Sequence, residues 1–250
     1  MNNIIYDCRW STDVDEKFIS DFCKVEHEVF HNGYSKEHFE HKFIRDIYGA
    51  SVLEVVYIDD NPSAARALWR NDIDGREAYQ PGDTCVLEVC RGKGVFTEMT
   101  MRSIDMLPKS AIIYNFPNLN SYPGYIKMGW RLLHQYRVKL FTSVTEYLIE
   151  HPIKMDDEYA RWWILGNRLS YIRRSGHYFL LQKDRRPFCY NVFCEVNETI
   201  AQQFPRLTIG VVFYRTTKKT IFNSIFQPSH VVCRSTDVSY IPTWKIDAVN

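Results

Sequence analysis

The stretch that decides the fold is Val86-Leu87-Glu88-Val89-Cys90-Arg91-Gly92-Lys93-Gly94-Val95-Phe96, which lies inside the longer segment Thr84–Trp130. An apolar strand pattern runs into two glycines separated by a lysine, and a helix pattern begins immediately afterwards. The start of a helix presents unpaired N–H groups and partial positive charge. The pattern therefore predicts a site for an anion, and a phosphate suits it best.

Composition sets the broad class of the protein. The chain has 250 residues, of which 45% are hydrophobic and 24% charged, as in ordinary globular proteins. This length suits one large domain or two small ones. With 31 basic and 30 acidic residues, the charge balance does not favour nucleic acid or an anionic membrane as a partner.

Neither the N-terminus nor the cysteines suggest export. The segment Met1–Asp7 lacks the basic and apolar regions of a signal peptide. No apolar run approaches the ~20 residues that span a bilayer. The seven cysteines form no C-x-x-C pair. We therefore expect a reduced, cytoplasmic protein with no membrane partner.

Periodicity predicts the order of elements in the first half. Ser11 or Thr12 is a candidate cap for the first helix, and Ser35 is a candidate cap for the second. Further along, strands alternate with helices, which implies at least one parallel pair and helices on both faces of a mixed sheet. The expected strands cover 1–10, 51–58, 63–69, 83–89, 111–116 and 130–141, and the expected helices cover 15–30, a segment beginning at 36, and 96–106.

The sequence pattern changes near residue 150, where strand-like segments become more frequent than helical ones. A helix is expected at 156–165, followed by strands at 169–172, 178–181, 190–196, 207–213 and 231–235. A helix followed by strands also occurs at 37–58, so the second half resembles a degenerate repeat of the first. We predict a domain at 1–148 and a β-rich domain at 149–250.

The glycine loop resembles one known signature more than its rivals. A dinucleotide fingerprint needs a third glycine where Thr97 stands, and a Walker A loop needs four residues between its first glycine and Gly-Lys. Arg91-Gly92-Lys93-Gly94 after a strand resembles the acyl-CoA signature of the GCN5-related N-acetyltransferases, Q/R-x-x-G-x-G/A. Phe96 departs from it, because the sixth position is normally small.

A second segment supports the same family. Asn118-Leu119-Asn120-Ser121 and Tyr125-Ile126-Lys127-Met128-Gly129-Trp130 are similar to the family's N-x-x-A/S and Y-x-K-x-G-F/W, in the same order and spacing. The resemblance covers about residues 1–145 and implies a mixed α/β acyl-CoA N-acyltransferase fold. Phe116-Pro117-Asn118 and the Tyr125 segment are also similar to bacterial acetyltransferases of surface-polysaccharide loci.

The resemblance implies acetyl-CoA as cosubstrate and no metal. Backbone amides at 93–96 would hold the pyrophosphate, two cations would add charge, and the end of the preceding strand would bind the pantetheine arm beside Asn118. The expected cofactor-binding residues are Cys85, Val86, Leu87, Arg91, Gly92, Lys93, Gly94, Val95, Phe96, Asn118 and Ser121.

The resemblance also implies acetyl transfer to a primary amine of a small molecule by direct attack, with an amino sugar as one candidate acceptor. Tyr125 is the expected general acid, since a phenol with an ordinary pKa of about 10 is protonated at neutral pH. Glu54, Asp83 and Glu88 are candidate bases, with Asp83 preferred, and a water chain is an alternative.

Two other functions stay open. His27-Glu28-Val29-Phe30-His31 matches H-E-x-x-H, the pattern of zinc hydrolases. Asn32-Gly33 ends the helix too early for that pattern. A non-catalytic acyl-CoA-binding protein is the other alternative. The part after residue 150 carries no motif. Its expected role is to form one side of the acceptor site or the contact surface of a homodimer.

Overall fold

The computed structural model of the protein describes residues 3–31, 35–155, 157–164, 169–220 and 228–242. Contacts group the chain into two compact units. Unit 1 comprises Met1–Asn115, Leu119–Arg131 and Val232–Val238, and unit 2 comprises Phe116–Asn118, Leu132–Val231 and Ser239–Asn250. Within the described ranges, no helix is both long and apolar enough to cross a membrane.

Unit 1 is a mixed sheet with the strand order β1-β2-β3-β4-β5-β11. Strands β1 to β4 are antiparallel, β5 is parallel to β4, and β11 is antiparallel to β5. The elements are β1 (Ile4–Trp10), α1 (Glu16–Phe30), α2 (Lys36–Phe39), β2 (Val52–Ile58), β3 (Asn61–Arg70), β4 (Ala78–Val86), α3 (Val95–Asp105), β5 (Ile112–Asn115), α4 (Tyr122–Lys127) and β11 (Ser229–Cys233).

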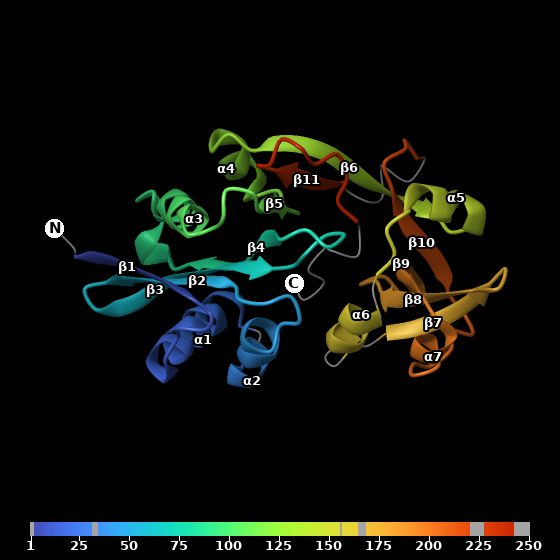
Figure 1. Ribbon diagram of the computed structural model, residues 1–250, viewed down its shortest axis with the longest axis horizontal. Coiled ribbons are helices and arrows are strands. Elements are labelled where there is room, and N and C mark those ends of the chain that lie inside the picture. The colour runs from blue at the N-terminus through green and yellow to red at the C-terminus, as the bar shows by residue number, and fades with distance from the viewer. Residues whose placement is uncertain (1–2, 32–34, 156, 165–168, 221–227, 243–250) are drawn as a thin grey trace. The chain divides into compact units, whose positions relative to one another are not determined.

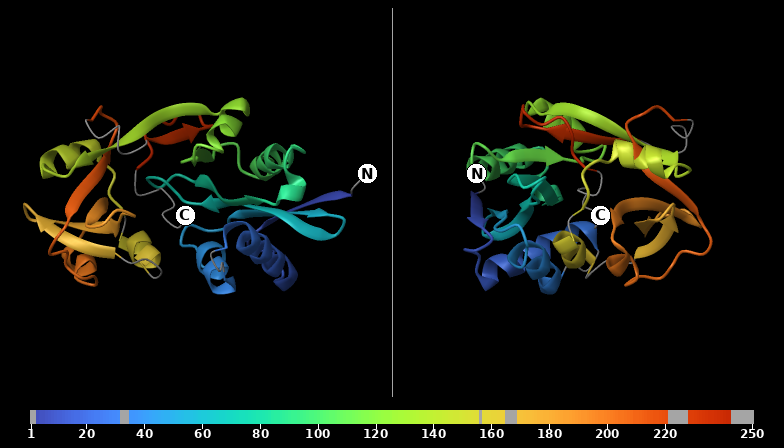
Figure 2. Two further views of the ribbon diagram at one scale, coloured as in Figure 1. Left: turned by 180° about the vertical axis from the view of Figure 1, so that it is seen from behind. Right: turned by 45° about the vertical axis from the view of Figure 1, so that its right-hand side comes forward.

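Helices cover both faces of this sheet, as predicted. Helices α1 and α2 lie on one face and α3 lies on the other (Figures 1 and 2). On the α1 side, Phe22, Phe39 and Phe43 form an edge-to-face aromatic cluster, and all three are buried. On the opposite side, Val95 and Met99 of α3 pack in one apolar cluster with β2 and β3.

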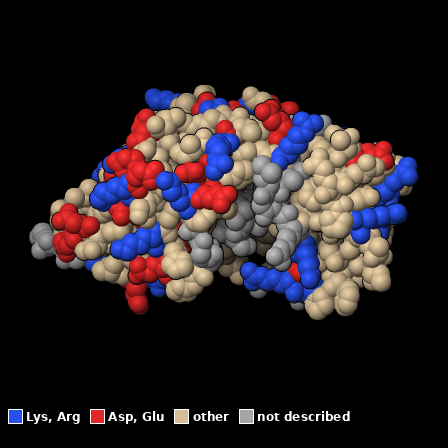
Figure 3. Space-filling view, turned by 90° about the horizontal axis from the view of Figure 1, so that it is seen from below, with Lys and Arg blue, Asp and Glu red and all other residues tan. Residues whose placement is uncertain are grey.

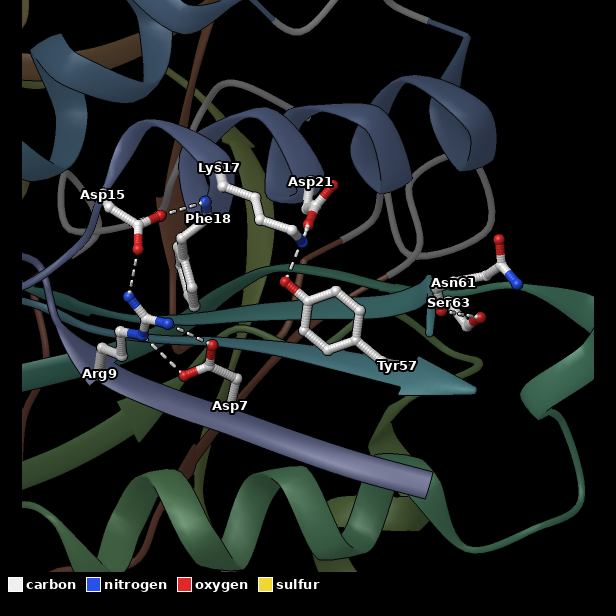
Figure 4. A network of polar contacts seen from close by, with 9 residues as sticks. All are labelled: Asp7, Arg9, Asp15, Lys17, Phe18, Asp21, Tyr57, Asn61 and Ser63. Carbon is white, nitrogen blue, oxygen red and sulfur yellow. Dashed lines mark hydrogen bonds and ion pairs between the residues drawn. The ribbon is translucent and has the colours of Figure 1, made fainter. Parts of the chain in front are cut away.

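The cap of α1 differs from the prediction. Asp15, and not Ser11 or Thr12, accepts the N–H of Phe18 at 2.8 Å, while its other carboxylate oxygen accepts from Arg9 (Figure 4). An aspartate directly before the first turn accepts an N–H group that has no acceptor within the helix. Its negative charge also interacts favourably with the positive end of the helix dipole. The cap of α2 at Ser35 is confirmed, since its Oγ accepts the N–H of His38.

Strand β4 begins five residues before the predicted start at 83 and ends at Val86. Pro81 and Gly82 belong to this strand, and both pair with β3. A β-bulge explains this, because the register shifts between Ala65 and Ala67 and leaves two residues of β4 opposite Arg66. Asp83, one of those two, has a φ of 42°. The residues after the strand, Glu88–Cys90, form a 3-10 turn.

The surface of unit 1 carries both signs of charge. Lys17 pairs with Asp21 along α1, and Lys36 pairs with Glu16. Acidic and basic side chains are interspersed on the part of this surface at the left of Figure 3. This is the mixed charge that the composition indicates.

Unit 2 is β-rich, with the strand order β6-β10-β9-β8-β7. Helices α5 and α7 are absent from the sequence prediction, because seven and four residues are too few for a clear helical period. Strand β10 begins at Val211 and not at 207. The elements are β6 (Arg131–Leu140), α5 (Val144–Glu150), α6 (Asp157–Ile164), β7 (Leu169–Arg174), β8 (His177–Lys183), β9 (Cys189–Val196), α7 (Glu198–Ala201) and β10 (Val211–Thr216).

The two units share a topology. In unit 1 the antiparallel strands β2-β3-β4 lead through α3 to the parallel strand β5. In unit 2 the antiparallel strands β7-β8-β9 lead through α7 to the parallel strand β10. A register shift marks β9 against β8, between Leu180 and Leu181, as one marks β4 against β3.

Each unit also contains a strand that is distant in sequence from its pairing partner. β11, near the C-terminus, pairs with β5 in unit 1, and β6, which follows α4, pairs with β10 in unit 2. Contacts therefore place the change of unit at Leu132 and return Val232–Val238 to unit 1. The domain ranges 1–148 and 149–250 stay a prediction.

Candidate functional site

The glycine loop connects β4 to α3 as the sequence indicates. Gly92 and Gly94 have φ values of 72° and 77°, a left-handed conformation that favours glycine. A Cβ built at either position has no atom within 4 Å, so backbone conformation and not crowding requires these glycines. Both residues are exposed.

The start of α3 leaves donors available at this loop. Thr97 and Glu98 both donate to the carbonyl of Gly94 at 3.0 Å. Across the described residues, the N–H groups of Gly94, Val95 and Phe96 have no acceptor. These are the orphan donors of a helix N-terminus.

Two cations lie on the same loop. Arg91 and Lys93 are exposed, and no carboxylate of the described chain lies within ion-pair distance of either. Unpaired positive charge beside orphan N–H groups is the electrostatic environment that a phosphate ester needs.

Strands β4 and β5 separate next to this loop. They pair only through Ala78 with Ile112 and Tyr79 with Ile113 among the described residues, although β4 continues to Val86. The rest of β4 therefore has backbone groups directed away from β3 that β5 does not use. Cys85 and Val86 lie on this part, and the N–H of Leu87 bonds to the carbonyl of Ser63.

Phe96, the residue that departs from the signature, packs against the second motif. Its ring lies edge to face with the Tyr125 ring, with 5.6 Å between centroids. A Cβ built on Gly124 would lie 3.1 Å from the Phe96 ring. The absence of a side chain at Gly124 in α4 therefore leaves space for the Phe96 ring of α3. The two motifs are in contact.

Tyr125 is buried, with 2% of its surface exposed. Its ring also packs on Trp130 at 4.8 Å between centroids, and its hydroxyl oxygen accepts a hydrogen bond from Arg66 Nη2 at 2.8 Å. No acceptor for its O–H is found in the described part of the chain. The proton of this phenol is thus available at the interface of α3 and α4.

Asp83, the preferred base, is held by a cation. Lys42 Nζ lies 3.0 Å from its carboxylate, and both side chains are buried. The Lys42 ammonium also lies 5.0 Å from the centre of the Trp69 ring. The Asp83 carboxylate is therefore part of a buried ion pair.

Cys85 directs its side chain to the α1 face of the sheet. Its thiol donates to Glu26 Oε1 at 3.2 Å, and both residues are buried. Burial and the Glu26 carboxylate raise the pKa of this thiol, so it is not a nucleophile. Its expected contribution to a ligand is through the backbone.

Glu54, another candidate base, lies on the α3 face. Ser103 donates to its Oε2 at 2.7 Å, and burial raises its pKa to about 7. Arg66 is its cross-strand neighbour on β3. The sequence analysis did not single out Arg66, although a charged residue in the apolar run Ala64–Trp69 was the available signal.

Three expected residues lie elsewhere. Asn118 is exposed and belongs to unit 2, so its role beside the loop stays a prediction. Ser121 precedes the first turn of α4 in unit 1, where its carbonyl accepts the N–H of Tyr125 at 3.2 Å. Glu88 is the first residue of the 3-10 turn that leads to Arg91.

The H-E-x-x-H segment does not form the expected helix face. His31 lies beyond the last residue of α1 with a φ of 53°, while His27 and Glu28 are exposed within the helix. In the described ranges, no three potential ligands gather as a metal site would need. Asn32 and Gly33 lie outside the described residues.

Comparison with known proteins identifies the fold. No family model and no curated protein matches the chain. A Pyrococcus horikoshii protein described as an acetyltransferase matches 97% of this chain and 94% of its own, at 12% identity and a TM-score of 0.55. A GCN5-related N-acetyltransferase from Anabaena variabilis matches 93% and 72%, at 11% identity and 0.55.

A third solved structure, a GCN5-related N-acetyltransferase from Kribbella flavida, matches 91% of this chain and 72% of its own, at 13% identity and a TM-score of 0.52. The chain therefore has the mixed α/β fold of the GCN5-related acyl-CoA N-acyltransferases. The fold prediction is confirmed.

Proposed function

We propose that the protein is an acyl-CoA-dependent N-acetyltransferase that acetylates a primary amine of a small molecule. One observation carries this proposal: Tyr125 packs on Phe96 at the start of α3, so the second motif meets the glycine loop. An anion-binding helix start and a buried phenol then belong to one site in unit 1.

The glycine loop is the proposed site of the CoA pyrophosphate. The free N–H groups of Gly94, Val95 and Phe96 point out of the helix start, and each charge-assisted hydrogen bond contributes about 1.5–3 kcal/mol. Arg91 and Lys93 add charge. The part of β4 that β5 does not pair, with Cys85 and Val86, and the following residue Leu87 are the proposed partners of the pantetheine amides. Asn118 and Ser121 are further candidates.

The proposed chemistry is direct attack. The neutral amine forms an N–C bond to the acetyl carbonyl carbon, the C–S bond breaks, and the thiolate takes the proton of the Tyr125 hydroxyl. The products are an amide and the CoA thiol, and the nitrogen releases one proton, which a base or solvent carries back to the Tyr125 phenolate. A general acid contributes about 100- to 10,000-fold to such a step.

Two buried carboxylates are the candidate bases. Asp83 keeps this role as a candidate, although Lys42 Nζ lies 3.0 Å from its carboxylate. Glu54 has a pKa near 7, which suits a base at neutral pH, yet it is fully buried among β2, β3 and α3. A water chain that ends at one of these carboxylates fits both observations.

Thermal shift with acetyl-CoA tests the binding part. A ligand at 100 times its Kd stabilises the folded state by about 2.7 kcal/mol, and we expect a rise of several degrees in Tm. No shift with acetyl-CoA, together with a loss of stability on zinc chelation, would remove the transferase proposal in favour of a metalloenzyme.

Substitution of Tyr125 tests the chemistry. With a responsive amine from a broad panel, Tyr125→Phe should lower the rate of thiol release at least about tenfold and leave CoA affinity unchanged. Tyr114→Phe is the matched control, since Tyr114 is also a buried tyrosine of unit 1 whose hydroxyl donates to a backbone carbonyl. Equal turnover by both variants would remove Tyr125 from the mechanism.

The similarity of 116–130 to acetyltransferases of surface-polysaccharide loci makes an amino sugar the first group of amines to test. The seven cysteines are all unpaired, which agrees with the proposed reducing, cytoplasmic setting. Gel filtration tests the proposed homodimer.

We also infer that unit 2 is a degenerate second half of the same fold. Three antiparallel strands, a crossover helix and a parallel strand follow in the same order in both units, with a register shift at the same pair of strands. Between β9 and α7 a single residue, Asn197, replaces the glycine loop. Unit 2 is therefore not a proposed CoA site.

A further inference from the structure

Arg66 occupies an unusual position for a charged residue. It lies in the middle of β3 and has no exposed surface. Its neighbours along the strand are Ala65 and Ala67, and the bulge of β4 lies opposite. Transfer of a guanidinium from water to such an environment is costly unless other groups compensate it.

The hydrogen bond and the cation–π contacts of the Arg66 guanidinium are with Tyr125 and with Phe96, which packs on it. Its Nη2 donates to the Tyr125 hydroxyl oxygen at 2.8 Å. Its guanidinium carbon lies 5.1 Å from the ring centre of Phe96 and 5.8 Å from that of Tyr125. These two aromatic rings provide the cation–π contacts that stabilise a desolvated arginine.

The charge of Arg66 is not neutralised by contact. Its Nε and Nη1 are buried and have no acceptor in the described part of the chain. Glu54 of β2 is its cross-strand neighbour, but no ion pair joins them, and the Glu54 carboxylate instead accepts from Ser103. A buried cation without a contacting anion acts strongly on the nearest oxygen.

We propose that Arg66 is a positioning residue that orients the Tyr125 hydroxyl and stabilises the negative charge left on its oxygen after proton transfer to the CoA thiolate. This rests on the proposed function. In the step, the O–H bond of Tyr125 breaks and an S–H bond forms on the departing thiol. The phenolate keeps the hydrogen bond from Arg66 until a proton released by the acceptor amine restores the hydroxyl.

Geometry explains the orienting effect. The N–H of Arg66 occupies one lone pair of the Tyr125 oxygen, so the O–H must point in another direction. A donor that carries full positive charge also strengthens its bond as the oxygen becomes negative. The hydrogen bond is therefore stronger after proton transfer than before it, which is the requirement for lowering a barrier.

Ionisation of the phenol tests this without any turnover. We would place 3-fluorotyrosine at position 125 of the full chain and follow its 19F signal against pH. Arg66→Gln should reduce the ionisation constant of the fluorophenol at least about tenfold. The control Arg102→Gln, which removes an exposed arginine that also faces Glu54, should leave it unchanged.

Other charged groups near the site also affect the ionisation of the phenol. Glu54 on β2, Glu98 and Arg102 on α3, and the thiol of Cys8 on β1 face this region. Glu54 ionises near pH 7, and burial raises the pKa of Cys8 to about 12. Arg66 also lowers the pKa of Glu54, so this carboxyl ionises at a higher pH in Arg66→Gln than in the wild type. The ionisation constants are therefore compared at pH values at which Glu54 is ionised in both chains. Equal ionisation in wild type and Arg66→Gln would overturn the proposal.

A second measurement applies if Arg66→Gln does not fold. The wild-type chain carries 3-fluorotyrosine at 125 or at 147. At 147 no cation of the described chain compensates burial, and burial together with Cys194, Tyr240 and Glu195 raises the pKa of the phenol well above its ordinary value. We expect the group at 125 to ionise at least one pH unit lower. Ionisation at the same pH, or at neither position before unfolding, would overturn the proposal.

Kinetics separate this inference from the proposed function. Arg66→Gln should lower kcat for thiol release by about 10- to 100-fold, with KM for acetyl-CoA changed less than about twofold. In the Tyr125→Phe background the same change should have no further effect, and a fully additive loss would contradict the positioning role. Absence of turnover with every amine would count against the proposed function, while the ionisation result would still decide the role of Arg66.

Discussion

Unit 1 and unit 2 follow the same strand order but bury different side chains. Over the described residues, the buried charged side chains Glu26, Lys42, Glu54, Arg66 and Asp83 all lie in unit 1. The buried polar residues found in unit 2 are His151 and Thr216, within an aromatic core around Phe141 and Tyr147. Buried charge costs stability and is most often retained for function.

The connections from strand to crossover helix also differ between the two units. Eight residues separate β4 from α3, with two left-handed glycines, and α3 has 11 residues. One residue separates β9 from α7, and its side chain accepts the N–H of Ile200 at 2.9 Å. In unit 2 the helix start is thus capped by the protein itself. Topology alone does not make an anion site, and the open loop is the additional element.

The largest expected effect is on CoA affinity, and it should distinguish the loop glycine from a glycine of similar conformation in unit 2. Gly94→Asp should reduce CoA affinity at least about 100-fold (about 3 kcal/mol), because a carboxylate would stand where the phosphates bind. Gly176→Asp is the matched control, since Gly176 also has a positive φ, 83°, and no atom within 4 Å of a built Cβ. Isothermal titration with CoA measures both.

Aspartate tolerates this backbone conformation better than most residues, so both variants should fold. Far-UV circular dichroism and thermal unfolding check that they do. A similar loss of CoA affinity in both variants, or in neither, would break the contrast between the two units.

Buried charge predicts the next effect, on stability. Burial raises the pKa of Glu54 from 4.5 to about 7, so the folded state holds this proton more tightly than the unfolded chain. Its contribution to stability is therefore complete below about pH 4.5 and is lost as the pH rises to about 7. Glu54→Gln should stabilise the protein by about 2 kcal/mol at pH 8 and leave stability at pH 4 nearly unchanged.

Urea unfolding at both pH values measures this difference. Ser103 can still donate to the amide oxygen of glutamine, which keeps the local hydrogen bond. Glu195→Gln in unit 2 is the contrasting control, because hydrogen bonds from His177 and Lys154 outweigh burial and lower the pKa of that carboxyl. It should destabilise at pH 8, and equal signs for the two variants would contradict the contrast.

The sequence predicted those features of unit 1 that depend on local conformation. Two glycines before a helix pattern require a left-handed backbone wherever they stand, so the loop and the start of α3 were evident. The length of β4 was wrong because Pro81-Gly82 usually signals a turn, whereas here a bulge accommodates them. Local signals did not show how a distant strand would pair with these residues.

Features that depend on distant pairing were not predicted. Strand β11 joins β5 across more than 110 residues, and β6 joins β10 across about 75, with no local pattern to indicate either partner. Arg66 was missed for a related reason, since its partner Tyr125 is 59 residues away. The site was thus predictable as two motifs, while the residue between them required the fold.

Removing one positive charge from the loop should have a smaller effect than placing a carboxylate in it. Lys93→Gln should weaken CoA binding about five- to tenfold, and the remaining affinity should depend less on salt. Arg173→Gln in unit 2, which likewise removes an exposed cation, should leave CoA binding unchanged. Titrations at low and high ionic strength measure both effects. An unchanged salt dependence in Lys93→Gln would place the phosphates elsewhere.

The smallest expected effect concerns the contact of Phe96 with Gly124. Alanine is about 1 kcal/mol better than glycine in a helix interior, but a Cβ at 124 would lie 3.1 Å from the Phe96 ring. Gly124→Ala should therefore change stability little in the wild type and stabilise by about 1 kcal/mol in the Phe96→Ala background. A double-mutant cycle by urea unfolding measures this coupling. Additive effects would mean that the large residue at 96 is tolerated without the glycine, and that the two motifs do not depend on each other.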